Sequence, residues 1–244
     1  MPHDKILRLF HIINHILLIV GLVYINLQLL CISIIVYVVL VMMGMNIGLH
    51  RYFAHRSFKT YDPVEKFMGV CAVISTVGSP LVWVAIHRQH HRSSDQLSDP
   101  HSPQHSGKIK TLLGMWNFES VDFALSKDLM RDKFQRFLHK NYHWIILSYC
   151  TTLAVINPWL IIFAYAIPAC LCFWGAGLVN VYSHGSGYKN HITSDNSTNN
   201  IFNSIITLGE GWHNNHHASP GSYKQGEKWW ELDPPSWIIK LIKN

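Results

Sequence analysis

Histidine is the residue type whose placement in this chain most clearly suggests chemistry. The chain has 17 histidines, and nine of them fall in four short clusters. The neutral imidazole ring is the commonest metal ligand in proteins, so such clusters are candidates for metal binding. The third cluster also contains an asparagine four residues before its histidine. The ten candidate ligands are His50, His55, His87, His90, His91, Asn180, His184, His213, His216 and His217.

Two of the clusters share the pattern His-x-x-His-His, which suits a metal site built on a helix. On a helix, residues i, i+3 and i+4 share a face, whereas adjacent residues diverge by about 100°. We therefore expect His87 and His90 to bind one metal while His91 points toward a neighbouring one. The cluster that begins at His213 repeats this arrangement, and the third cluster is an i, i+4 pair. Two such units predict two metals.

The ligand type narrows the choice of metal. Neutral imidazole suits zinc, copper, iron and nickel. A structural zinc needs only four ligands, so nine histidines exceed one such site. A pair of redox-active irons fits the two units better. Few acidic residues lie near the clusters; Glu210, Asp95 and Asp99 are candidates to orient imidazoles through the second ring nitrogen.

The other histidines are expected to be ordinary solvated or hydrogen-bonded side chains. A single histidine outside such a pattern is more often a hydrogen-bonded side chain than a ligand. This group comprises His3, His11, His15, His101, His105, His139, His143 and His191.

Composition indicates that lipid surrounds much of the chain. Hydrophobic residues make up 49% and charged residues only 14%, against roughly 25% charged in an average soluble domain. The net charge of +6 could suggest nucleic acid or an anionic lipid surface. However, no Lys or Arg occurs between Leu9 and His50 or between Asn141 and Tyr188. Each gap leaves room for two crossings of roughly 20 residues, and no nucleic-acid surface is expected.

The predicted fold is an all-α integral membrane domain spanning residues 1–244. Four transmembrane helices are expected in two hairpins, over 10–24 with 29–49 and over 142–156 with 159–182. Residues 50–141 and 183–244 would form a helical cap that contains the histidines. All 20 Lys and Arg then fall on one face, which the positive-inside tendency makes cytoplasmic together with both termini.

The apolar stretch Phe67–Ile86 is not expected to cross the membrane. A crossing would separate the histidines before and after it by about 30 Å of hydrocarbon. Gly69, Gly78, Ser79 and Pro80 also interrupt the stretch. We expect helices that lie at the membrane interface and pack against the spans.

These motifs resemble those of the membrane fatty-acid desaturase family, particularly its stearoyl-CoA desaturase-like branch. Three segments resemble its histidine boxes, and three others resemble stretches of bacterial members. The similarity extends from about Met43 to the C-terminus. The boxes are Gly48–Thr60, His87–Asp95 and Gly209–His217; the other stretches are Ser79–Trp83, Asp99–Pro103 and Lys228–Pro234.

The resemblance implies a mushroom-shaped fold, two irons and dioxygen as co-substrate. It implies no catalytic residue beyond the metal ligands and no organic cofactor. By position, one iron would be held by His50, His55, His91 and His217, with Asn180 reaching it through water. The other would be held by His87, His90, His184, His213 and His216.

The resemblance also implies an activity: dioxygen-dependent introduction of a cis double bond into a fatty acyl chain, in unsaturated fatty acid biosynthesis. A delta-9 bond in a C16–C18 chain is expected, with the carrier (CoA, acyl carrier protein or intact lipid) left open. The electron donor would be a separate protein, such as ferredoxin or a small cytochrome with its reductase. A bacterial inner membrane is the expected location.

Three alternatives remain open at this point. A membrane hydroxylase or ketolase would use similar histidine boxes and insert oxygen instead of removing hydrogen. A non-enzymatic metal-binding membrane protein would need ionisable or ligating residues along its spans to form a pathway, and the first two spans contain no Asp, Glu, Lys or Arg. A lipid-binding scaffold leaves the nine clustered histidines unexplained.

Overall fold

The computed structural model describes residues 3–115 and 120–244, and this part of the chain is helical without strands. Residues 116–119, which belong to the expected cap, lie outside the described residues. Two of the helices, η1 and η4, are π-helices, and η3 is a 3₁₀-helix. The helices are α1 (His3–Val23), α2 (Leu27–Val39), η1 (Leu40–Ala54), α3 (Asp62–Ile74), α4 (Pro80–Ser93), α5 (Pro103–Ser106), α6 (Lys108–Leu112), η3 (Phe123–Ser126), α7 (Lys127–Arg131), α8 (Lys133–Lys140), α9 (Tyr142–Ile156), η4 (Ile162–Ala166), α10 (Ile167–Tyr182), α11 (Ile201–Thr207), α12 (His213–Ala218) and α13 (Pro234–Ile242).

Three helical segments are long and apolar enough to cross a membrane. They are Lys5–Val23, Leu27–Ala54 and Ile162–Tyr182, and α9 is a shorter apolar helix. Large apolar side chains such as Ile19, Ile35 and Val155 are exposed on these helices. Water does not favour so much exposed apolar surface, whereas lipid does. The helix over 142–156 has the expected bounds, but α1 begins earlier than residue 10 and the second segment continues beyond residue 49.

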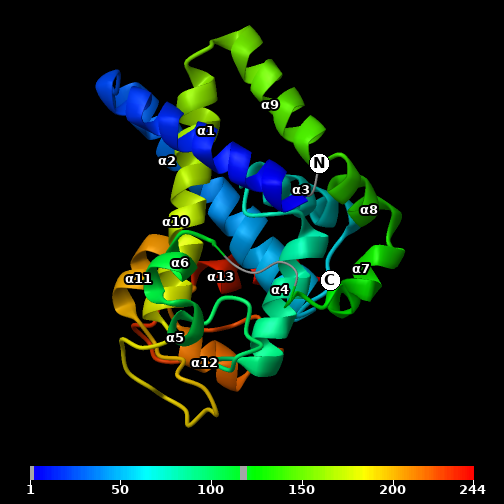
Figure 1. The fold of residues 1–244 in the computed structure, drawn as a ribbon, viewed down its shortest axis with the longest axis vertical. Helices are drawn as coiled ribbons and strands as arrows, with labels where there is room; N and C mark the ends of the chain where they lie inside the picture. The colour runs from blue at the N-terminus through cyan, green and yellow to red at the C-terminus, as the bar shows by residue number, and fades with distance from the viewer. Residues whose placement is uncertain (1–2, 116–119) are drawn as a thin grey trace.

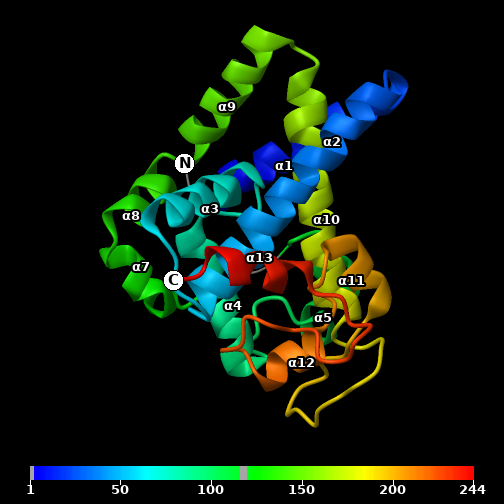
Figure 2. The same cartoon turned by 180° about the vertical axis from the view of Figure 1, so that it is seen from behind.

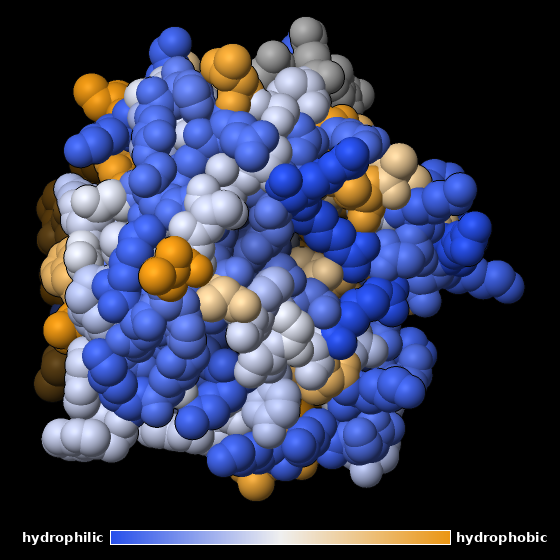
Figure 3. Space-filling view, turned by 90° about the horizontal axis from the view of Figure 1, so that it is seen from below, coloured by the Kyte–Doolittle hydropathy of each residue, from blue (hydrophilic) through white to orange (hydrophobic). Residues whose placement is uncertain are grey.

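The apolar helices and the histidine-rich segments lie at opposite ends of the molecule. The α1–α2 and α9–α10 connections are at the upper end in Figure 1, and α12 is at the lower end. Seen from below, the lower end is mostly hydrophilic (Figure 3). The long apolar helices therefore extend away from a polar cap.

Two helices, α3 and α4, replace the single apolar stretch over residues 67–86. The break contains Gly78 at a φ of +121°, and Pro80 begins α4 in the first turn, where proline is tolerated. Gly69 does not interrupt α3, contrary to the expectation. The lack of a side chain at Gly69 allows Leu138 to pack closely against α3, because a Cβ there would lie 2.7 Å from Leu138 Cδ1. Helix α3 contacts η1, α8 and α9 (Figure 2).

The π-helix η4 is anchored by side chains of neighbouring helices. A π-helix bonds i to i+5 and disturbs the regular backbone ladder, so carbonyl groups need other partners. Ser33 Oγ of α2 donates to Phe163 O at 2.7 Å, and Tyr149 OH of α9 donates to Ala164 O at 3.1 Å. These bonds fix the start of α10, the helix that leads to His184.

Candidate metal centre

The nine clustered histidines come together in two groups, each with ring nitrogens within 4.8 Å of one another. Every one of these side chains is buried or half-buried. Residues from η1, α4, α12 and the segment after α10 meet here, although they are far apart in sequence. The five-histidine group comprises His50, His55, His87, His91 and His216, and the four-histidine group comprises His90, His184, His213 and His217.

This grouping corrects the division of ligands expected from the sequence. His87 and His216 lie in the five-histidine group, and His217 lies in the four-histidine group. On both α4 and α12, the histidines at i and i+4 share a group and the histidine at i+3 joins the other. Residues at i and i+4 lie only about 40° apart on a helix, so they align best toward one point. Each helix therefore contributes to both groups.

The π-helix η1 explains the spacing of His50 and His55. Five residues along an α-helix would turn two side chains about 140° apart. In η1 the His55 N–H donates to His50 O at 3.1 Å, which is the i to i+5 bond of a π-helix. The two imidazole ring centroids are 5.0 Å apart. The His-x4-His spacing was thus a signal of a π-helix that the sequence analysis missed.

Arg88 joins the end of η1 to α4. Its guanidinium donates to Phe53 O at 2.9 Å and to Ala54 O at 2.8 Å, which satisfies carbonyl groups at the end of η1. Asp128 of α7 pairs with the same guanidinium at 2.8 Å. Because Arg88 follows His87 directly, this contact fixes the histidines of η1 and α4 relative to each other.

Two buried asparagines hold α12 in place. Asn214 Oδ1 accepts the backbone N–H groups of Asn190 and His191, both at 2.8 Å. The Asn215 amide donates to Glu231 Oε2 at 2.8 Å. A helix of six residues gains little stability from its own hydrogen bonds, so these contacts fix its orientation. The sequence analysis did not assign a role to either asparagine.

The ring nitrogens of the four-histidine group point at a common centre. The Nε2 atoms of His90 and His217 are 3.3 Å apart, those of His184 and His213 are 3.0 Å apart, and those of His213 and His217 are 3.1 Å apart. Imidazole nitrogens bound to one metal at about 2.1 Å, at right angles, would lie about 3.0 Å apart. Hydrogen bonds between the rings cannot explain all three of these short nitrogen–nitrogen distances. The arrangement therefore fits a metal ion.

The five-histidine group has the same geometry. The Nε2 atom of His216 is 2.9 Å from those of both His50 and His91. The Nε2 atoms of His55 and His87 are 2.8 Å apart. This group also offers its nitrogens to one ion, as expected for a metal that prefers imidazole ligands.

Burial favours the neutral form of several of these imidazoles, which is the form that binds a metal. Burial, with neighbouring histidines, lowers the pKa of His90, His213 and His216 well below its usual value. The same causes lower the pKa of His91 to about 3. At neutral pH these rings carry no charge and can offer nitrogen lone pairs.

Carboxylates orient four of the rings through Nδ1. A carboxylate that accepts the Nδ1–H leaves Nε2 free for a metal and fixes the ring. Three of these carboxylates are the candidates from the sequence. The fourth, Asp195, was missed; its only sequence signal is that it ends a long stretch without Asp or Glu. The pairs are Asp99 with His90 at 2.9 Å, Asp95 with His184 at 3.1 Å, Asp195 with His217 at 2.6 Å, and Glu210 with His50.

His101 belongs to this region and is not the ordinary histidine that the sequence suggested. It is buried, and its ring centroid is 4.4 Å from that of His90. Its backbone N–H donates to Asp99 Oδ1 at 3.2 Å. The Asp99-Pro-His101 turn brings His101 to this position. Its distance along the sequence from the histidine clusters did not indicate this.

Other histidines have ordinary partners away from both groups. The His15 ring accepts from Trp174 Nε1 at 3.0 Å, and the His191 ring pairs with Glu227 at 2.8 Å. His139 lies 2.7 Å from Ser79 Oγ. The His143 ring lies beside Trp144, with centroids 5.0 Å apart. The side chain of His3 lies outside the described residues.

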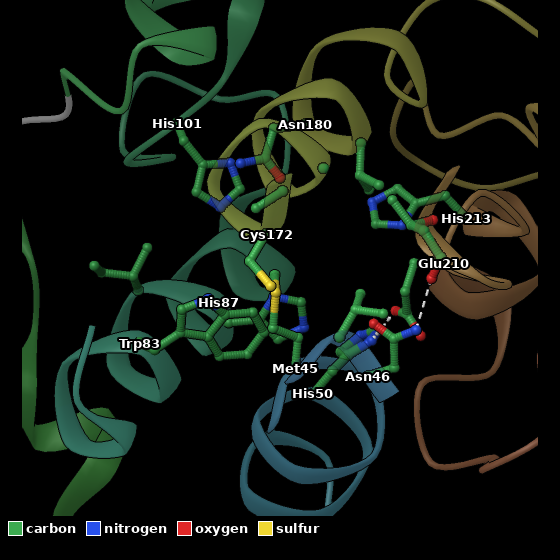
Figure 4. Close-up of a pocket in the computed structure, with 16 residues that line it drawn as sticks. Met45, Asn46, His50, Trp83, His87, His101, Cys172, Asn180, Glu210 and His213 are labelled. Carbon is green, nitrogen blue, oxygen red and sulfur yellow. Dashed lines mark hydrogen bonds and ion pairs between the residues drawn. The ribbon is translucent and has the colours of Figure 1, made fainter. Parts of the chain in front are cut away.

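An apolar pocket of about 670 Å³, partly open to solvent, adjoins both groups. His50, His87 and His213 line it, and Figure 4 shows His101 beside Asn180 on its wall. Asn180 therefore faces the pocket, one helical turn before His184. The apolar part of the wall consists of Val41, Met45, Trp83, Ile86, Cys172, Gly175, Ala176 and Val179.

Comparison with known proteins places these features in a family. The model of the fatty acid desaturase family matches residues 27–240. This chain belongs to the fatty acid desaturase family. The desaturase is accordingly an oxidoreductase of fatty acyl metabolism.

Similar curated proteins differ in substrate. The sn-1 stearoyl-lipid 9-desaturase of Anabaena variabilis is 32% identical over 82% of this chain and 75% of its own length. The sn-2 palmitoyl-lipid 9-desaturase of Nostoc sp. is 32% identical over 82% of this chain and 73% of its own. The acyl-CoA 5-desaturase AL21 of Anemone leveillei is 32% identical over 86% of this chain and 68% of its own.

The observed grouping predicts which histidine variants lose the same metal. The double variant His184→Ala/His217→Ala should retain about one metal per chain, because both residues belong to the four-histidine group. The double variant His55→Ala/His217→Ala should retain about none, because it impairs both groups. Metal-to-protein ratios of purified protein, measured by mass spectrometry, give the answer.

His143→Ala serves as the control and should keep the wild-type ratio, because its ring lies outside both groups. The opposite pattern, with one metal left in His55→Ala/His217→Ala, would support the division expected from the sequence and contradict the observed grouping.

Proposed function

We propose that this desaturase introduces a delta-9 cis double bond into a C16–C18 fatty acyl chain, with two irons and dioxygen. The observation that supports this most strongly is the apolar pocket, whose wall includes His50 and His87 of the five-histidine group and His213 of the four-histidine group. The balanced reaction is –CH2–CH2– + O2 + 2 e⁻ + 2 H⁺ → –CH=CH– + 2 H2O. Relatives named 9-desaturases of stearoyl and palmitoyl lipids support the bond position and chain length.

The nine histidines would hold the two irons, and Asn180 would approach one of them through water. Two bound irons would supply the activation of dioxygen that an unactivated C–H bond requires. The surrounding residues orient the rings, keep them neutral and exclude water from the pocket. Apolar walls with few polar groups suit a hydrocarbon chain and protect it from side reactions.

The depth of the pocket indicates how the acyl chain lies. Asn180 and Cys172 are eight residues apart on α10, which corresponds to about 12 Å of helix. Both line the pocket, with Asn180 near the histidines and Cys172 toward the apolar helices. The methyl end of the chain would therefore lie near Cys172 and Val41.

A second pocket suggests where the carrier end of the substrate lies. It shares Trp83 and Ala176 with the first pocket and extends to Arg8 and His11 of α1. Arg8 supplies a cation at this pocket, which could contact an anionic carrier. The acyl chain would pass from the second pocket into the first.

The same proposal includes the membrane topology and the partners. Four helices would cross a bacterial inner membrane in two hairpins, as one domain over residues 1–244, with the cap and both termini in the cytoplasm. The position of all Lys and Arg relative to the charge-free gaps supports this. Ferredoxin, or a small cytochrome with its reductase, would deliver the two electrons.

Fatty-acid analysis of a bacterial host tests the reaction. The host should lack its own desaturase and supply a compatible electron donor. Wild type should produce new monounsaturated chains, and His90→Ala should reduce them to the level of the empty host, because a ligand is lost. Gas chromatography with mass spectrometry identifies the products and the bond position.

His143→Ala, which removes a histidine outside both groups, should retain the wild-type product level. Hydroxylated chains in place of unsaturated ones would indicate the hydroxylase reaction instead. Unchanged lipids, despite two bound irons per chain and an active donor, would contradict the proposal.

Chain length should respond to the far end of the pocket. Cys172→Leu adds volume there and should shift products toward shorter chains, with roughly a tenfold loss of efficiency for each methylene that no longer fits. Cys172→Ala removes volume and should accept the original chains. Product profiles from acyl chains of increasing length measure this, and metal content should stay at the wild-type value. An unchanged profile in Cys172→Leu would show that the chain ends elsewhere.

A further inference from the structure

The carboxylates around the two histidine groups are unevenly distributed. In the four-histidine group, three of the four rings have a carboxylate at Nδ1: Asp99 at 2.9 Å, Asp95 at 3.1 Å and Asp195 at 2.6 Å. In the five-histidine group, the ion pairs of the described residues include one such carboxylate, Glu210 at His50. The group with fewer histidines thus has more negative charge around it.

The single carboxylate of the five-histidine group is also partly neutralised. Glu210 pairs with Arg51 at 3.0 Å, and Arg51 is 1% exposed. The same guanidinium pairs with Asp233 at 2.8 Å. The carboxylate of Glu210 is thus shared between the His50 ring and the Arg51 guanidinium.

Within residues 3–115 and 120–244, none of the ion pairs joins one of these three aspartates to an arginine or a lysine. Their carboxylates pair with histidines and accept backbone N–H groups instead. Asp95 accepts from Asn196 N at 2.7 Å, Asp99 from Asp95 N at 2.9 Å and Asp195 from Ser197 N at 3.0 Å. These bonds hold the carboxylates in place beside the rings, and their donors are uncharged.

The difference affects the two metal positions to different degrees. A carboxylate at Nδ1 increases the basicity of the imidazole and attracts the cation through space, and loss of one such partner typically costs 10–100-fold in metal affinity. Three unneutralised carboxylates act on the four-histidine position. At the five-histidine position the only such carboxylate is shared with Arg51, which also pairs with Asp233, so less negative charge acts on the cation there. The additional imidazole of the five-histidine group brings no negative charge, so it does not offset this difference.

We propose that the two metal positions have unequal affinity, with the four-histidine position filled first because Asp95, Asp99 and Asp195 act on it as positioning residues. The inference rests on the proposed two-metal function. It makes the five-histidine position the one that loses its ion first. A chain with a single metal would therefore hold it between His90, His184, His213 and His217.

Zinc binding to the full-length chain tests the order. The chain is purified in detergent, depleted of metal and titrated with Zn²⁺ against a chromogenic chelator. Wild type should bind two ions with different dissociation constants. Asp195→Asn should raise the smaller constant 10–100-fold, and Glu210→Gln should raise the larger one. Glu227→Gln is the matched control: it removes a carboxylate that pairs with the surface histidine His191 and should change neither constant.

The outcomes separate this inference from the proposed function. A wild-type chain that binds fewer than two ions would contradict the two-metal function itself. Two ions with equal constants, or a change in the larger constant on Asp195→Asn, would overturn only the order. Asp99→Asn provides a second test of the four-histidine position if Asp195→Asn fails to fold, as judged by circular dichroism and gel filtration.

Discussion

Nine imidazoles in two groups, with neighbouring Nε2 atoms about 3 Å apart within each group, are the arrangement on which the rest of the structure depends. Without a cation between them, these nitrogen lone pairs would repel one another. Burial lowers the pKa of several of the rings and disfavours their protonation, so a metal ion would complete the arrangement. The surrounding polar residues hold the rings in this otherwise unfavourable geometry.

Each helix that contributes histidines is fixed by a contact specific to it. The π-helix η1 aligns His50 with His55, and Arg88 binds its last carbonyl groups. Two buried asparagines hold α12. Side chains of α2 and α9 anchor η4, and α10 continues from it toward His184. The apolar helices thus position a site for which their own residues supply few ligands.

The sequence predicted the elements better than their contacts. The helix over 142–156, the interruption of the apolar stretch at Gly78 and Pro80, and the convergence of the nine clustered histidines follow from composition and spacing, which are local. The division of ligands between the two groups was wrong, because the sequence analysis paired i with i+3 where the structure pairs i with i+4 on both α4 and α12. Asp195 and His101 reach the site through loops whose course no periodicity determines. The π-helix was missed because its signal, the spacing of five residues from His50 to His55, conflicts with an α-helix.

X-ray absorption at the iron edge tests the central claim most directly. Purified full-length chain, reconstituted with Fe²⁺, should bind two irons whose first shell is mainly nitrogen at about 2.1 Å, with the outer scattering of imidazole. That result would agree with nine histidine ligands and no bridging carboxylate. A first shell dominated by oxygen, or a chain that binds a single iron at saturation, would contradict the account.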